Sequence, residues 1–224
     1  MDHIKDALNS HTLQALPRII GLLNGERSAL AVMANANAVD YRMPWLQGGP
    51  LDEAGFRAHV DEGAVRLLRE AGSIAILLDN AGEAVVDIAY ALLRASQGVR
   101  VVLVARSMEY ETDVTQAEAK RLTADIAEAL GLDPGPVEVL GTGTDYPAPI
   151  RSKIHPATAE ALDGVDLVIS KGIANFEALM EECWPSPDRV IVALKAKCPP
   201  VARELGVGLG DAVAKLGYRC RLRG

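Results

Sequence analysis

Short apolar runs alternate with helix-like segments through most of this 224-residue chain, and this alternation constrains the fold more than any other feature. Five of the runs are rich in Val, Ile and Leu and have the length of buried strands. They cover residues 74–78, 99–104, 137–140, 165–169 and 189–194. Because helices connect parallel strands across both faces of a sheet, we expect an α/β fold. The pattern favours a three-layer α/β/α sandwich with a mostly parallel, doubly wound sheet.

Helical periodicity predicts the helices that connect these strands and those that precede them. A stripe of apolar residues after the first run indicates a helix over about 83–95, and Thr115 with Glu118 predicts a capping box at the start of a later helix. Before residue 72 the pattern is helical, and we expect one amphipathic helix over 56–71. The chain therefore divides into a helical N-terminal region, residues 1–71, and an α/β domain, residues 72–224, that carries the functional site.

Composition and charge exclude several classes of protein. The formal net charge of −7 argues against a general nucleic-acid partner, and no apolar run approaches the length of a membrane span. The three cysteines are far apart and form no Cys-x-x-Cys pair, so neither a zinc cage nor a disulfide framework is indicated. The polar N-terminus does not resemble a signal peptide. We therefore expect a cytoplasmic protein without a membrane partner.

Acidic and amide side chains follow the first two predicted strands. Asp79 and Asn80 come directly after the first, and Asp113 lies in the loop after the second. Carboxyl ends of parallel strands meet at one edge of a sheet, where ligands bind. Oxygen ligands of this kind suit a hard divalent cation. The alternative is a plain Asp-Asn turn, with Asp113 only supporting the start of its helix.

Lysines and glycines follow the later strands. Lys171 and Gly172 come after the fourth run, and Lys195 and Lys197 after the fifth. Lysine side chains and loop amides near helix N-termini can hold a phosphate group. Each feature alone has a simpler explanation, as a turn or as surface charge. Their occurrence at successive strand ends favours a metal-assisted phosphoryl site.

Four segments resemble a known family in order and spacing. They are Asp79-Asn80-Ala81-Gly82-Glu83, Thr112-Asp113-Val114-Thr115, Ser170-Lys171-Gly172-Ile173-Ala174-Asn175-Phe176-Glu177 and Leu194-Lys195-Ala196-Lys197-Cys198. The family is the metal-dependent damage-control phosphatases, catalogued as domain of unknown function 89. The resemblance covers residues 29 to about 205, and the first and third segments together are specific to it.

The resemblance implies hydrolysis of phosphate monoesters of small metabolites, often damaged or sugar- or cofactor-like, with Mn²⁺, Mg²⁺, Co²⁺ or Ni²⁺. It places the metal ligands on Asp79, Asn80 and Asp113. Glu83 would orient these groups or transfer a proton, although it could simply complement the N-terminus of its helix. The substrate phosphate would lie near Asn175 and Lys195, and Lys171 would add positive charge. Asn37 and Asp40 belong to one further segment, Asn37-Ala38-Val39-Asp40, which resembles a family segment that flanks the site.

The sequence departs from the family pattern at several positions. Ala36 stands where a Gly is usual, Thr112 where an Asn often precedes the Asp, and the loop 107–110 lacks a Pro. The N-terminal region is also shorter than in the microbial members, so we expect a more open pocket, or one completed by a neighbouring subunit in a homo-oligomer. The resemblance does not identify which metabolite is the substrate. The alternative function is a non-catalytic nucleotide- or metabolite-binding Rossmann-like module, which would not need Asp113.

Overall fold

The computed structural model describes residues 2–37 and 56–221 of the chain. Its α-helices are α1 (Asp2–Ile19), α2 (Glu26–Ala36), α3 (Glu62–Glu70), α4 (Glu83–Ser96), α5 (Gln116–Leu130), α6 (Pro156–Asp163), α7 (Ile173–Glu182) and α8 (Pro199–Leu205). Its strands are β1 (His59–Val60), β2 (Ser73–Leu77), β3 (Arg100–Ala105), β4 (Val137–Gly141), β5 (Leu167–Lys171), β6 (Val190–Lys195) and β7 (Ala212–Leu216). Short 3₁₀ helices span Ile20–Asn24 and Pro187–Arg189.

All these strands join one sheet in the order β1-β7-β6-β5-β2-β3-β4. Strands β2 to β6 are parallel to their neighbours within the sheet, and β7 runs antiparallel to β6. The five strands expected from the apolar runs are β2 to β6, each shifted by no more than two residues at either end. The predicted mostly parallel, doubly wound sheet is therefore confirmed.

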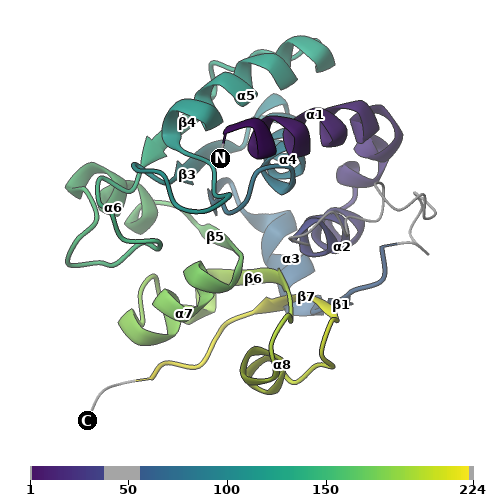
Figure 1. The fold of residues 1–224 in the computed structure, drawn as a ribbon. Helices are drawn as coiled ribbons and strands as arrows, with labels where there is room; N and C mark the ends of the chain where they lie inside the picture. The colour runs from purple at the N-terminus through teal and green to yellow at the C-terminus, as the bar shows by residue number, and fades with distance from the viewer. Residues whose placement is uncertain (1, 38–55, 222–224) are drawn as a thin grey trace.

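Helices cover both faces of the sheet, as Figure 1 shows. In β2, Ile74 and Ile76 belong to one apolar cluster with residues of α1 to α5, whereas Ala75 and Leu77 belong to a second cluster with residues of α6, α7 and α8. Side chains of a strand alternate between its two faces, so a strand buried on both sides has no polar face. The three-layer sandwich explains why these runs are continuously apolar.

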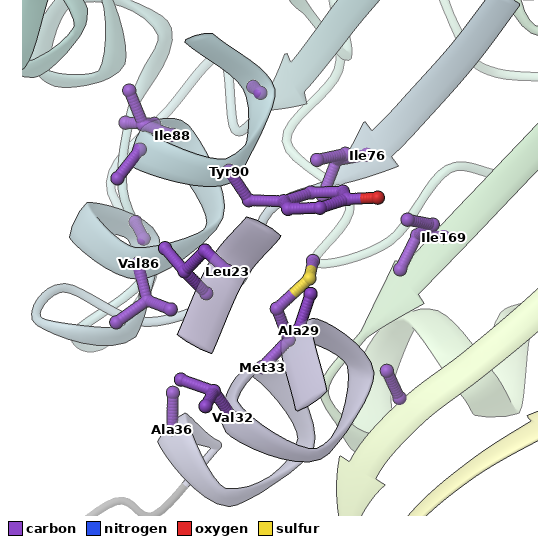
Figure 2. Packing of buried hydrophobic residues seen from close by; sticks show 14 of the residues in the cluster. Leu23, Ala29, Val32, Met33, Ala36, Ile76, Val86, Ile88, Tyr90 and Ile169 are labelled. Carbon is purple, nitrogen blue, oxygen red and sulfur yellow. The ribbon is translucent and has the colours of Figure 1, made fainter. Parts of the chain in front are cut away.

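The N-terminal helices pack onto α4 and extend the first layer. Met33 of α2 and Tyr90 of α4 lie beside Ile76 of β2 and Ile169 of β5 in Figure 2, and all four side chains are no more than 1% exposed. Leu23, which follows α1, lies in the same cluster. Because α2 packs directly against the sheet-covering layer, its last residues are held near the ends of the strands.

Two segments differ from the sequence prediction. Residues 56–71 form β1 and then α3, because the Asp61 side chain accepts a hydrogen bond from the Gly63 N–H at 2.6 Å and starts the helix at Glu62. The chain after α8 forms β7, which completes the sheet together with β1. Part of the N-terminal region thus belongs to the sheet, while the division into two domains at residue 72 stays a prediction. The capping box at Thr115 and Glu118 is confirmed.

Candidate active site at the carboxyl ends of the strands

The strand order reverses at β2, which marks where a ligand would bind. The chain moves from β2 to β3 and β4 on one side and then returns to β5 and β6 on the other. Ligands of open α/β sheets bind outside the carboxyl ends of the strands at such a switch point. The residues that follow β2 and β5 are therefore the centre of the candidate site.

A short backbone ladder brings Asp113 beside Asn80. The Ala81 N–H donates to the Thr112 carbonyl at 2.7 Å, and the Val114 N–H donates to the Asp79 carbonyl at 3.0 Å. These bonds join the segment after β2 to the loop after β3. The side chains of the two acidic residues are buried, with Asp79 6% and Asp113 4% exposed. The three predicted metal ligands therefore converge, although 33 positions separate Asn80 from Asp113 in the sequence.

The Asp79 carboxylate is the most crowded acidic group of the site. Its Oδ2 accepts hydrogen bonds from Nδ2 of Asn80 at 2.7 Å and Nδ2 of Asn37 at 3.1 Å. Burial, together with the negative charges of Glu83 and Asp113, raises the pKa of Asp79 well above its ordinary value. A cation bound nearby would relieve this repulsion.

Arg106 connects the acidic residues to the start of α7, which follows β5. Its Nε donates to Oδ2 of Asp113 at 2.6 Å, and its Nη1 donates to Oδ1 of Asn175 at 3.0 Å. Its Nη2 lies 3.6 Å from Oδ1 of Asp79. Burial raises the pKa of Asp113, although the Arg106 guanidinium acts in the opposite direction. No role for Arg106 was predicted from the sequence.

Glu83 orients the amide side chains around Asp79. Its carboxylate accepts from Nδ2 of Asn37 at 2.8 Å and from both the backbone N–H and Nδ2 of Asn80, at 3.1 and 3.0 Å. Burial alone would raise the pKa of Glu83, but the charges of Lys171 and Lys197 lower it to about 2. Glu83 is therefore ionised at neutral pH, which suits an orienting role better than proton donation.

Lys171 has different contacts from those implied by the family resemblance. Its ammonium is fully buried and lies 3.0 Å from Oε2 of Glu83 and 3.0 Å from both carboxylate oxygens of Asp87. These three acceptors use all the hydrogens that an ammonium can donate. No donor of Lys171 is left for a substrate, so its contacts are those of a residue that supports Glu83.

Asp87 was missed in the sequence and completes this buried charge group. It lies one helical turn after Glu83 on α4, so both carboxylates face Lys171. Burial raises the pKa of Asp87 to about 7, because one ammonium serves two carboxylates. The spacing of Glu83 and Asp87 in a helix that is otherwise apolar was the signal that could have identified it.

The two lysines after β6 have different positions. Lys195 uses its backbone N–H, which donates to Oδ1 of Asn37 at 3.2 Å. Lys197 has an exposed side chain, and its charge lowers the pKa values of Asp79 and Glu83. Lys197 therefore contributes positive charge to the site from this strand end, while the assignment of the phosphate contact to Lys195 stays a prediction.

The structure shows the contacts of two of the remaining predicted site residues, Asn175 and Asn37. Asn175 is buried, and its Nδ2 donates to the carbonyl oxygens of Leu78 and Lys171, at 3.2 and 2.8 Å, so it ties β2 to β5. Asn37 ends α2 and contacts the site directly through Asp79 and Glu83. Asp40 lies outside the described residues. Thr112, which departs from the family pattern, donates from Oγ1 to Oδ1 of Asn80 at 2.6 Å.

The donor set fits a hard divalent cation. Within residues 2–37 and 56–221, no three His, Cys, Asp or Glu side chains are arranged to hold a metal ion. A site here would instead combine the carboxylates of Asp79 and Asp113 with the amide oxygen of Asn80. Mg²⁺-like ions take few protein ligands of this kind and keep several waters. Burial and the neighbouring charges of Glu83 and Asp113 both disfavour an ionised Asp79, and a bound cation would offset that cost.

A doubly wound α/β/α sandwich with buried carboxylates at its switch point defines a class of proteins that bind ligands at the carboxyl ends of their strands. The family follows from direct comparison. Residues 53–213 match the model of the damage-control phosphatase ARMT1-like domain, so the chain belongs to that family.

Individual relatives agree with this assignment. A protein named damage-control phosphatase from Archaeoglobus fulgidus is 29% identical over 95% of this chain and 74% of its own length. A second, damage-control phosphatase PH1575 from Pyrococcus horikoshii, is 32% identical over 65% of this chain and 47% of its own length. An uncharacterised protein from Methanocaldococcus jannaschii is 31% identical over 62% of this chain and 43% of its own length.

A solved structure has the same fold. The crystal structure of a DUF89 family protein from Pyrococcus horikoshii superposes with a TM-score of 0.69, at 22% sequence identity, over 93% of this chain and 74% of that one. The predicted fold and the family resemblance are both confirmed. Among the described residues, no helix has the length and apolar character needed to cross a membrane.

Proposed function

We propose that this protein is a metal-dependent phosphatase that hydrolyses phosphate monoesters of small metabolites, including damaged or sugar- or cofactor-like ones. Membership of the damage-control phosphatase family supports the general activity. The observation that carries the proposal is the convergence of Asp79, Asn80 and Asp113, from two loops, on one buried position at the switch point. We also propose a cytoplasmic location and a small phosphorylated metabolite as the physiological partner.

Asp79, Asn80 and Asp113 would hold the divalent ion, for which Mn²⁺, Mg²⁺, Co²⁺ and Ni²⁺ are the candidates. When bound, such an ion neutralises charge on phosphoryl oxygens and lowers the pKa of a coordinated water. Thr112 supports this arrangement because its hydroxyl fixes the orientation of the Asn80 amide. The crowding that raises the pKa of Asp79 provides electrostatic attraction for a cation.

The rest of the chain supplies positioning and positive charge. Ionised Glu83 holds the amides of Asn37 and Asn80, and buried Lys171 holds Glu83. The exposed Lys197 would add positive charge for the phosphate dianion at the rim, and its charge acts on both Asp79 and Glu83. Electrostatic stabilisation by fixed charges of this kind is a major source of catalysis in phosphoryl transfer.

The test is turnover of para-nitrophenyl phosphate by the purified protein. The protein is first stripped of metal with a chelator and then assayed alone and with Mn²⁺, Mg²⁺, Co²⁺ or Ni²⁺. We expect no turnover by the stripped protein and recovery with at least one ion. Metal-independent turnover would contradict the metal requirement. No turnover with any ion, for this substrate and for a panel of sugar phosphates, would favour the alternative of a non-catalytic metabolite-binding module.

A further inference from the structure

Arg106 has an unsatisfied hydrogen-bond donor inside the candidate site. Its side chain is 3% exposed, and Nη2 makes no hydrogen bond although it is buried. The nearest acidic atom, Oδ1 of Asp79, is 3.6 Å away, which is beyond hydrogen-bond distance. A buried donor without a partner is costly and uncommon in folded proteins, so it indicates a group that completes it.

The other two nitrogens of the guanidinium fix its position. Nε donates to Asp113 and Nη1 donates to Asn175, so the planar group is held at one edge by the loop after β3 and at another by α7. Asn175 is itself held by the carbonyls of Leu78 and Lys171. A guanidinium held in this way directs Nη2 to one place without needing to reorganise.

The chemistry around Nη2 of Arg106 favours an anionic oxygen as its hydrogen-bond acceptor. A guanidinium donates and never accepts, and its fork geometry suits phosphate oxygens. Two carboxylates, those of Asp79 and Asp113, already lie beside the guanidinium, so a third carboxylate would not be favourable there. A phosphoryl group would accept the hydrogen bond from Nη2 of Arg106, and its negative charge would be shared between Arg106 and a metal ion beside the carboxylates.

We propose that Arg106 is a catalytic residue that donates from Nη2 to a non-bridging oxygen of the substrate phosphoryl group, while Asp113 and Asn175 hold the guanidinium in place through Nε and Nη1. This inference rests on the proposed phosphatase function and adds a specific phosphate contact to it. The rival explanation is structural: Arg106 could simply neutralise Asp79 and Asp113. The two explanations differ in what the loss of the side chain does to metal binding and to phosphate binding.

The experiment measures the two affinities separately by calorimetry, with Mn²⁺ alone and then with inorganic phosphate at saturating Mn²⁺. The variants are Arg106→Gln and Arg106→Lys. The matched control is Arg189→Lys, at the opposite edge of the sheet, whose guanidinium donates to the carbonyls of Leu162 and Val165. Thermal unfolding of each variant verifies that it is folded.

We expect both Arg106 variants to lose phosphate affinity by about tenfold or more, as for one charge-assisted hydrogen bond. Affinity for Mn²⁺ alone should stay unchanged or increase in Arg106→Gln, because a competing positive charge leaves Asp79 and Asp113. Arg189→Lys should change neither affinity. Parallel loss of both affinities in the Arg106 variants, or retention of phosphate affinity, would overturn the proposal.

The same measurements distinguish this proposal from the function itself. A wild-type protein that binds phosphate through Arg106 but turns over no phosphate ester would contradict the phosphatase function and leave the contact standing. A wild-type protein that binds no phosphate at saturating Mn²⁺ would overturn the Arg106 contact whatever its activity. If both Arg106 variants fail to fold, the remaining test is nuclear magnetic resonance of the wild-type protein with labelled arginine: the Arg106 guanidinium resonance should shift when phosphate is added at saturating Mg²⁺, and no shift overturns the proposal.

Discussion

Gly172 lies directly against Asp79: a Cβ atom added to Gly172 would be 2.0 Å from Oδ2 of the Asp79 carboxylate. The backbone of Gly172 has a φ of 77°, which L-amino acids with a side chain rarely adopt. The glycine in the Ser-Lys-Gly segment is therefore required twice, once by its own conformation and once by the acidic residue of the neighbouring strand end.

This contact makes Gly172→Ala a sensitive test of the site. The control is Gly206→Ala, because Gly206 has a similar φ of 72° and no atom within 4 Å of an added Cβ. Both variants should lose about 1 kcal/mol of unfolding free energy from backbone strain. Gly172→Ala should in addition displace the Asp79 side chain and lose Mn²⁺ affinity by calorimetry. Equal unfolding free energies and equal Mn²⁺ affinities in the two variants would show that the close approach of Gly172 to Asp79 does not affect metal binding.

Replacing Asp79 by Asn should abolish metal-dependent turnover and leave the fold intact. The change removes one negative charge without changing side-chain volume, and burial of the charge at this position is already unfavourable. Thermal unfolding should therefore show no loss of stability. Asp125→Asn, at an exposed position of α5, is the control and should keep full activity. Turnover by Asp79→Asn at saturating metal, equal to wild type, would exclude Asp79 as an essential ligand.

Alanine variants of Lys195 and Lys197 should separate their roles. Lys197→Ala should lower kcat/KM by about tenfold, because it removes one charge-assisted contact to the phosphate. Lys195→Ala should have a smaller effect, since the contact of Lys195 with Asn37 uses the backbone N–H, which alanine keeps. The affinity for Mn²⁺ should hardly change in either variant. A larger loss in Lys195→Ala would restore the assignment favoured by the sequence.

Asp87 should make stability depend on pH near neutrality. Its pKa rises from 3.8 to about 7 on folding, so the folded protein binds this proton more tightly than the unfolded chain. The free energy of unfolding should therefore fall as pH increases from about 4 to about 7 and stay low above it. Asp87→Asn mimics the protonated form and should remove much of this decline.

Urea unfolding of wild type and Asp87→Asn at a series of pH values measures the effect. The difference between them should favour Asp87→Asn by on the order of 1–4 kcal/mol at pH 8 and should diminish toward pH 5. Asp125→Asn should follow the wild-type curve. A constant difference across the whole range would show that Asp87 does not hold a proton at neutral pH.

The sequence was sufficient for the parts of the fold that depend on local periodicity. Strands β2, β3, β5 and β6 have mostly buried residues on both faces, so each contains a continuous apolar run, and the capping box of α5 is visible in Thr115 and Glu118. Strand β1 has only two residues and pairs with a distant strand, so it leaves no periodic signal. Asp61 was the local feature that separated it from α3.

The candidate site was predictable in its position more than in its contacts. That Asp79, Asn80 and Asp113 meet follows from their places at strand ends in a parallel sheet. The direction of a lysine side chain does not follow, because Lys171 is the last residue of β5 and could point to solvent or into the α4 layer. The structure turns it toward Glu83 and Asp87, and the identity of its partners depends on packing between elements far apart in sequence.

The pairing of β1 with β7 has a consequence for how the protein is made. His59 aligns with Val213 in the sheet, so a strand synthesised early meets its neighbour only after nearly all of the described chain has left the ribosome. Helices α2 and α3, which flank β1, contact β7 as well and cannot complete their packing before then. Contacts between such distant segments slow folding. Until β7 arrives, the nascent chain exposes the open edge of β6, and that interval is when we expect it to depend most on chaperones.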